Sequence, residues 1–303
     1  MPNFTMPDGE KLYVRILGQG EPVLVLSGLG MQSWQWIPYI ASNLKKFQFI
    51  IPDWRGFGGS KNCKIPTELN AIESHWQDIE ALLDQLNLDS VTVIAYSMGA
   101  TTAMHGMQYG HFRDRIKRYL HIDQTPRIEA DEHWSYGLMG TKHPQLKQLL
   151  KQLSAFLHQH EGVKIISELN QNDQQKLIEM WIEFIELQAS DKLTPKVFRF
   201  AFNLPKVNQH ILPIQRLDYL TWYIDNYLNH HEDYREAISA LEKPTTFFIG
   251  EKSTLYASEG QIIIANSVAN NQQIIFRKSG HTPLITEPVK FSREISKFLN
   301  SNP

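Results

Sequence analysis

Short apolar runs alternate with helical patterns along the first 126 residues. From residue 69 to residue 86, apolar side chains recur at steps of three and four, which predicts an amphipathic helix. The small residues at 99–103 open a second helix. Because strands and helices alternate, we expect an α/β fold with a mostly parallel sheet and helices on both faces. The predicted strands are residues 12–17, 22–26, 47–51, 91–96 and 118–123.

The pattern changes between residues 127 and 240. Helical periods, clearest at 146–157 and 175–187, replace the strand-like runs. Strand patterns return at 245–249 and 273–276, and a last helix is predicted from Pro288 to residue 299. The simplest organisation is a sheet domain of residues 1–126 and 241–303, interrupted by a helical cap at 127–240. An insertion of this kind usually covers a ligand site at the carboxyl ends of the strands.

Composition narrows the class of protein. The chain has 303 residues, 42% of them apolar and 20% charged, with a formal net charge of −2. That balance is ordinary for a globular protein and gives no reason to expect nucleic acid or an anionic membrane as a partner. Cys63 stands alone, the chain opens without a signal-peptide pattern, and no apolar run reaches the roughly 18 residues of a membrane span. We expect a cytoplasmic protein; its oligomeric state is left open.

The sharpest chemical signal is Ala95-Tyr96-Ser97-Met98-Gly99, between a predicted strand and a predicted helix. Small residues two positions before and after the serine are needed where the two backbones crowd at a tight turn. The turn lifts the hydroxyl out of the sheet, and the helix N-terminus favours developing negative charge. Ser97 is therefore our candidate nucleophile. The alternative is that Ser97 only caps the helix.

Three further segments are similar to motifs of a known protein family. Ser-Gly-Leu-Gly at 27–30 and Asp-Trp-Arg-Gly-Phe-Gly-Gly-Ser at 53–60 each follow a predicted strand, and Ser-Gly-His stands at 279–281. Together with the serine motif, their order resembles the α/β-hydrolase fold over nearly the whole chain outside the cap. The resemblance implies that the backbone N–H groups of Leu29 and Met98 form an oxyanion hole, which would stabilise the charge developing on an attacked carbonyl.

The resemblance also implies the base. His281 follows the last predicted strand and precedes the final helix, where the family places its catalytic histidine. The catalytic acid is harder to assign, because Ser253 occupies the position three residues after Gly250 where the family most often carries aspartate. Asp123, at the end of the strand 118–123, is our preferred acid, and Glu251 is the alternative. Asp123 could instead bond the backbone of the turn that follows it.

Aromatic residues suggest the character of the substrate pocket. We expect Gly28, Trp34, Tyr96, Trp134 and Tyr136 to line it and to accept an apolar acyl or alkyl group.

Cofactor signals are weak in comparison. The glycine-rich turns lack the spacing of nucleotide-binding loops. The histidine pairs at 158–160 and 230–233 lie in polar helical stretches, where a solvated face is the simpler interpretation than a metal site. We therefore expect neither a cofactor nor a metal.

Three functions are consistent with the sequence. The leading hypothesis is hydrolysis of a carboxylic ester or lactone through an acyl-serine intermediate, with acyl-homoserine lactones among the candidate substrates. The second keeps the fold but catalyses cofactor-free, haloperoxidase-like perhydrolysis or C–C bond cleavage. The third is a non-catalytic sensor that binds a small apolar molecule.

Overall fold

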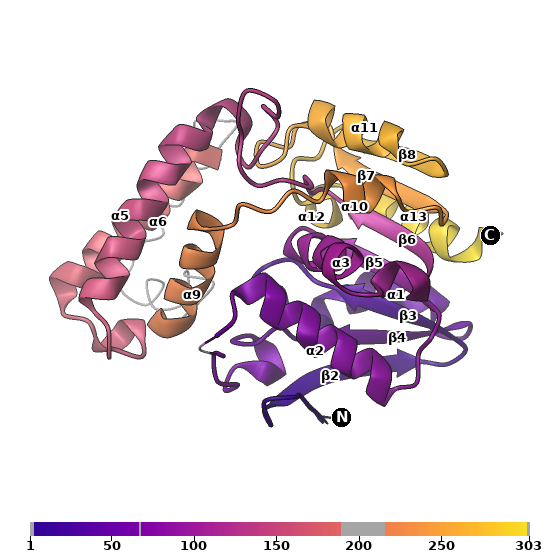
Figure 1. Ribbon diagram of the computed structural model, residues 1–303, viewed down its shortest axis with the longest axis horizontal. Helices are drawn as coiled ribbons and strands as arrows, with labels where there is room; N and C mark the ends of the chain where they lie inside the picture. The colour runs from indigo at the N-terminus through magenta and orange to yellow at the C-terminus, as the bar shows by residue number, and fades with distance from the viewer. Residues whose placement is uncertain (1–2, 67, 189–215, 302–303) are drawn as a thin grey trace.

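The computed structural model describes residues 3–66, 68–188 and 216–301. In these ranges eight strands form one sheet in the order β1-β2-β4-β3-β5-β6-β7-β8 (Figure 1). β2 runs antiparallel to β1 and β4, and every other neighbouring pair is parallel. The strands span Asn3–Thr5 (β1), Lys11–Gly18 (β2), Glu21–Leu26 (β3), Phe47–Pro52 (β4), Val91–Tyr96 (β5), Ile116–Ile122 (β6), Thr245–Gly250 (β7) and Asn271–Phe276 (β8).

Helices cover both faces of the sheet. In β3, Leu24 and Leu26 belong to one buried cluster, whereas Val23 and Val25 belong to the other, because successive side chains of a strand point to opposite faces. This arrangement confirms the predicted α/β class. The Leu24 side is covered by α2 (Ala71–Gln85), α3 (Met98–Tyr109), α10 (Arg235–Ser239) and α11 (Ser258–Ser267), and the Val23 side by α1 (Ile37–Ile40) and α13 (Pro288–Asn300).

The predicted strands are all present, but their neighbours could not be read from the sequence. β2 and β3 follow one another along the chain, yet each pairs with β4, which lies between them. The connection is tight: Gly18 and Gly20 have φ of +83° and +109°, and a Cβ on Gly20 would lie 2.1 Å from the Lys46 carbonyl oxygen. β1 was not predicted, because three residues are too few to show an alternation.

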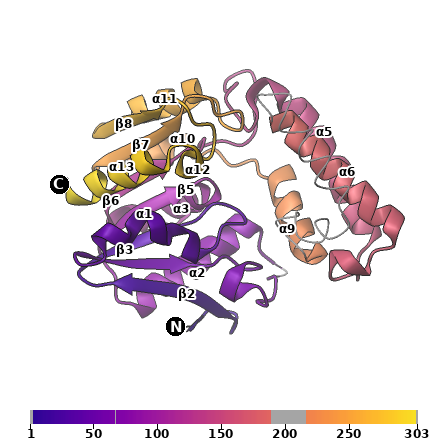
Figure 2. The same ribbon diagram turned by 180° about the vertical axis from the view of Figure 1, so that it is seen from behind.

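Between β6 and β7 the described chain forms helices and no named strand. α5 (His143–Gln159) and α6 (Gln171–Gln188) contain the two predicted helices, and α9 (Leu217–Leu228) was not predicted. These three helices lie beyond one end of the strands in both views (Figures 1 and 2). Residues 189–215 of the predicted cap lie outside the described ranges. No helix in the described part of the chain is long and apolar enough to cross a membrane.

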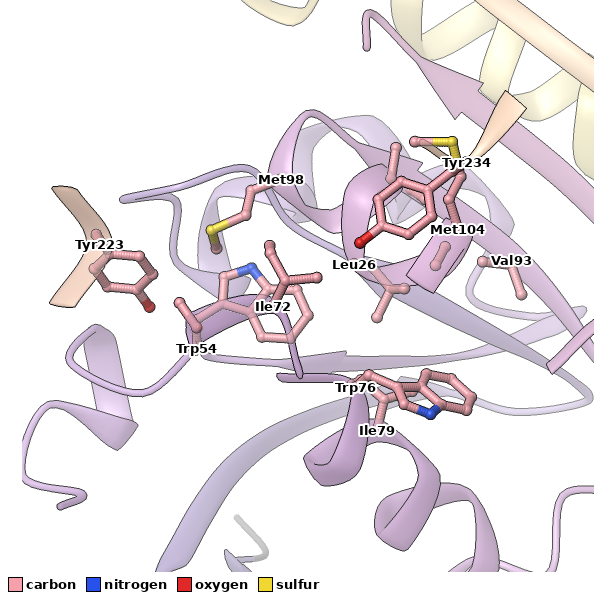
Figure 3. Close-up of a cluster of buried hydrophobic side chains, with 14 of the residues drawn as sticks. Leu26, Trp54, Ile72, Trp76, Ile79, Val93, Met98, Met104, Tyr223 and Tyr234 are labelled. Carbon is pink, nitrogen blue, oxygen red and sulfur yellow. The ribbon is translucent and has the colours of Figure 1, made fainter. Parts of the chain in front are cut away.

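One buried cluster joins the inserted helices to the sheet. Met98 at the start of α3, Trp54 after β4, Trp76 of α2 and Tyr223 of α9 all belong to it (Figure 3). The Tyr223 hydroxyl also donates a hydrogen bond of 3.0 Å to the Arg55 carbonyl oxygen. α9 is thereby fixed against the loop that follows β4.

The same loop contains a buried ion pair. The Arg55 guanidinium donates from Nε and Nη2 to the two Asp78 carboxylate oxygens, at 2.7 Å each, and from Nη1 to Asp8 at 2.5 Å. The side chains of Arg55 and Asp78 are only 3% and 1% exposed. Burial raises the pKa of Asp78, and the neighbouring Arg55 opposes that shift. The pair ties the loop after β4 to α2.

Breaking this pair is expected to destabilise the fold strongly. Asp78→Ala leaves a buried guanidinium with Asp8 as its remaining carboxylate partner, so we expect the free energy of unfolding to fall by about 3 kcal/mol. Asp84→Ala is the matched control, because Asp84 lies on the same helix and pairs with Arg115 at 2.6 Å while 59% exposed. Its loss should cost less than about 1 kcal/mol. Urea unfolding measures both, and equal losses would contradict the distinction.

Candidate active site

Ser97 occupies the turn between β5 and α3. Its backbone has φ of +52° and ψ of −124°, a conformation that residues other than glycine rarely adopt. Gly99 allows the turn to form, because a Cβ there would lie 2.2 Å from the Leu26 carbonyl oxygen of β3. Strained backbone of this kind is found at functional sites when the surrounding structure holds it in place. The side chain is presented at the carboxyl edge of the sheet.

His281 lies within hydrogen-bonding distance of Ser97. The distance from His281 Nε2 to Ser97 Oγ is 3.0 Å, across 184 positions of sequence. The imidazole is stacked with the Tyr96 ring at 5.3 Å and meets the Tyr256 ring edge-on at 5.4 Å. The Tyr96 hydroxyl also donates to the His281 carbonyl oxygen at 2.9 Å. Ring contacts and a backbone anchor therefore orient this histidine.

Asp123 lies on the other side of the imidazole. Its Oδ1 is 2.9 Å from His281 Nδ1, and the residue is fully buried. Because a carboxylate can only accept, Nδ1 carries the proton, and Nε2 is left with a lone pair facing the Ser97 hydroxyl. Glu251, the alternative acid, is an exposed residue on the turn after β7. The structure thus brings Ser97, His281 and Asp123 into one chain of contacts that does not include Glu251.

The loop after β3 is anchored through Ser27. The buried Ser27 hydroxyl accepts from Trp36 Nε1 at 3.0 Å, and its carbonyl oxygen accepts from Trp54 Nε1 at 2.7 Å. Leu29, two residues later, lines the cavity next to Ser97. Met98 is the first residue of α3, so its N–H has no carbonyl partner within the helix. Their role as oxyanion donors stays a prediction.

A cavity of about 300 Å³ opens directly onto Ser97 and His281. Its walls are mostly apolar and come from the sheet edge, from α5, α6 and α9, and from the loop after β7. Gly28 and Tyr96, two of the predicted pocket residues, belong to this lining. The inserted helices contribute Leu146, Leu149, Leu150, Leu153, Met180, Trp181, Phe184, Gln188, Leu220, Tyr223, Ile224 and Tyr227.

The other three predicted pocket residues lie elsewhere. Trp34 is 54% exposed, and its Nε1 donates to Gln32 Oε1 at 3.1 Å. Trp134 and Tyr136 pack edge-on against each other at 5.4 Å and line a separate hollow beside α10 and α11. Tyr136 fills the space above Gly260, where a Cβ would lie 2.3 Å from the Tyr136 Cβ. The aromatic residues at the start of the insertion therefore pack its base rather than the cavity.

The leucines of α5 were missed as pocket residues. Leu146, Leu149, Leu150 and Leu153 recur at three- and four-residue steps, so the sequence shows that they share a face. A helical face that lines a cavity has the same pattern as one packed against a core. The spacing alone could not separate the two.

Three histidines of the two predicted pairs each contact a carboxylate: His231 Nδ1 lies 3.0 Å from Glu129, and the other two are His158 and His160, whereas His230 is buried. His158 Nε2 lies 2.9 Å from Asp225, and His160 Nε2 lies 3.0 Å from Asp173. Among the described residues, no three histidine, cysteine or carboxylate side chains are arranged to hold a metal ion.

Comparison with known proteins identifies the family. The family model of the α/β hydrolase fold matches residues 21–288, so the chain belongs to that family. It is 23% identical to a pimeloyl-(acyl-carrier protein) methyl ester esterase of Vibrio atlanticus, over 95% of this chain and 98% of the other. An esterase from Exiguobacterium antarcticum superposes with a TM-score of 0.73 at 20% identity, covering 99% and 100% of the two chains. An enol-lactonase from Burkholderia xenovorans gives 0.62 at 18%, with the same coverage.

A buried histidine lies next to the cavity wall. His75 Nε2 is 2.9 Å from the Tyr223 hydroxyl, whose own proton is donated to Arg55. Nε2 must therefore be the donor, so Nδ1 is left without a proton and, among the described residues, without a partner. Complete burial, reinforced by the charge of Arg55, lowers the pKa of His75 to about 3.

This burial makes stability depend on pH. The unfolded chain protonates His75 near pH 6.5, whereas the folded protein keeps it neutral to about pH 3. The contribution of His75 to stability is therefore complete above pH 6.5 and decreases as the pH drops toward 3, by up to about 1.4 kcal/mol per pH unit. We expect His75→Gln to reduce that slope between pH 6 and pH 4 by about this amount. Unfolding measured over the range tests it, with the 93%-exposed His111 replaced by Gln as control.

Proposed function

We propose that the protein is a serine hydrolase that cleaves a carboxylic ester with an apolar acyl or alkyl part. Ser97 is the nucleophile, His281 the general base, and Asp123 the acid that orients His281. The observation that carries the proposal is the continuous line of contacts from Ser97 through His281 to Asp123, at 3.0 Å and 2.9 Å, beside an apolar cavity.

Acylation follows from these contacts. As Ser97 Oγ attacks the ester carbonyl carbon, its proton passes to His281 Nε2, which the contact with Asp123 leaves free to accept it. The carbonyl oxygen becomes an oxyanion, and the Leu29 and Met98 N–H groups are the donors we assign to it. The protonated His281 then gives its proton to the leaving alcohol oxygen. The C–O bond breaks, and the acyl group remains on Ser97.

Deacylation repeats the steps with water. His281 removes a proton from water as its oxygen attacks the acyl carbon, and the same oxyanion forms. Collapse of that intermediate breaks the bond to Ser97 Oγ, which regains its proton from His281. The products are a carboxylic acid and an alcohol, and the protein is restored.

The cavity supports an apolar substrate. Its size is in the range of small-molecule sites, and its walls are mostly leucine and aromatic side chains. A lactone is an internal ester and reacts by the same steps, except that the alcohol stays attached to the acyl group. Lactones, acyl-homoserine lactones included, therefore belong to the proposed substrate class, in keeping with the structural likeness to an enol-lactonase.

We further propose that residues 127–240 act as a cap over this site. The support is that α5, α6 and α9 supply more than half of the residues that line the cavity, whereas Ser97, His281 and Asp123 follow strands of the sheet. Chemistry and substrate selection would then come from different parts of the chain.

Removing the proposed catalytic groups tests the mechanism. We expect Ser97→Ala and His281→Ala each to lower kcat for p-nitrophenyl esters by at least about 10⁴-fold. Asp123→Asn should also lower kcat severely, because the imidazole loses its orienting carboxylate. His111→Ala and Glu251→Gln are matched controls at exposed positions and should behave like wild type.

A fluorophosphonate probe provides a readout that does not depend on the substrate. It should label the wild-type protein and not Ser97→Ala. A folded wild-type protein that remains unlabelled and turns over no ester or lactone would contradict the proposal. Tight binding of an apolar ester without any product would instead favour the sensor hypothesis.

Filling the cavity should change selectivity and leave the chemistry intact. Leu150 lines the cavity, and the adjacent Lys151 is exposed on the outer side of the same helix. We expect Leu150→Trp to lower kcat/KM for long-chain p-nitrophenyl esters by about tenfold or more while leaving the acetate ester within about twofold. Lys151→Trp should alter neither. A uniform loss across all chain lengths would place the acyl group outside this cavity.

A further inference from the structure

We infer that Ser253 is a positioning residue for the Asp123 carboxylate, an inference that rests on the proposed function. The Ser253 hydroxyl donates to Asp123 Oδ1 at 2.7 Å, and His281 Nδ1 lies 2.9 Å from that same oxygen. The serine therefore contacts the atom of the acid through which the histidine is oriented.

The order of the strands explains why Asp123 needs such support. Asp123 follows β6 and His281 follows β8, while β7 lies between these two strands. The carboxylate must therefore reach across the end of β7. Gly250 provides the path, because a Cβ there would lie 2.8 Å from Asp123 Oδ2 and 2.1 Å from the Gly280 carbonyl oxygen.

Two donors from the turn after β7 hold the carboxylate along this path. The Gly250 N–H donates to Oδ2 at 2.9 Å, and the Ser253 hydroxyl donates to Oδ1. The serine is the donor of the second bond because a carboxylate can only accept, and the Ser253 oxygen also accepts from the Tyr256 N–H at 3.3 Å. With one donor on each oxygen, the carboxylate plane is fixed, and Oδ1 faces His281.

The side chains at 123 and 253 act as a pair. Together they supply one carboxylate and one hydroxyl, joined at 2.7 Å. Two carboxylates at this separation would repel each other, whereas a serine beside an aspartate forms a charge-assisted hydrogen bond. Removing the hydroxyl should therefore loosen the hold on Oδ1 and, through it, on the imidazole.

The test measures nucleophile activation without requiring the natural substrate. The second-order rate constant for phosphonylation of Ser97 by a fluorophosphonate probe is compared with kcat and KM for a p-nitrophenyl ester. For Ser253→Ala we expect the probe rate and kcat to fall about tenfold, with KM within about twofold. Ser253→Thr, which keeps the hydroxyl, should recover most of the rate. Ser258→Ala is the matched control, because this serine begins α11 and is absent from the cavity lining.

Two results would overturn the inference. One is a Ser253→Ala protein that reacts with the probe at the wild-type rate while Ser97→Ala remains inert, which would leave the proposed function standing. The other applies where Ser253→Ala fails to fold, and compares Ser253→Thr with Ser253→Val, which has nearly the same shape but no hydroxyl. A probe rate about tenfold lower for Ser253→Val than for Ser253→Thr supports the inference, and equal rates overturn it. Turnover by Ser97→Ala would instead refute the proposed function itself.

Discussion

The arrangement of the site depends on the register of four neighbouring parallel strands. Tyr96 of β5 is paired with Ile122 of β6, Ile122 with Phe248 of β7, and Gly250 of β7 with Phe276 of β8. The four strands therefore end at nearly the same level, and the loops that follow them start side by side. Shifting one strand by a single residue would exchange its two faces and move its loop away from the others. Ser97, Asp123 and His281 are far apart in sequence, and they meet because the strands that precede them end at the same level.

Two of these strand ends have strained backbone. Ser97 and Asp123 both have positive φ, of 52° and 41°, although neither is glycine. Such conformations cost on the order of 1–3 kcal/mol each, and they persist where the surrounding structure determines them. Hydrogen bonds to the neighbouring strands hold both turns in place. The Ser97 N–H donates to the Ile122 carbonyl oxygen at 3.1 Å, and the Asp123 N–H donates to the Phe248 carbonyl oxygen at 3.0 Å. The sheet thus maintains the unusual turns that present both side chains.

Much of the fold was predictable because its signals are local. Apolar runs located the central strands, and the small residues around Ser97 marked the turn. The acid stayed open between Asp123 and Glu251 because the decision depends on strand order and on how far a side chain reaches across β7, neither of which is local. Trp34 and Trp134 were assigned to the pocket because aromatic character indicates burial without indicating which space is filled. The α5 leucines were overlooked because their spacing predicts a shared face without indicating whether that face lines a cavity or packs against a core.

The two ends of the segment that contains the inserted helices are bonded to each other. Arg127, where the chain leaves the sheet domain, forms a backbone bridge with Asp233, where it returns, and the Tyr234 N–H donates to the Pro126 carbonyl oxygen at 2.9 Å. Once the ends of a loop are held together, doubling its length adds only about 0.6 kcal/mol of closure entropy. A change in the length of the segment beyond these contacts therefore costs little closure entropy, provided that the packing of α9 against the sheet domain is kept. The segment that supplies most of the cavity wall can therefore change in length while the strand ends that carry Ser97 and Asp123 stay in place.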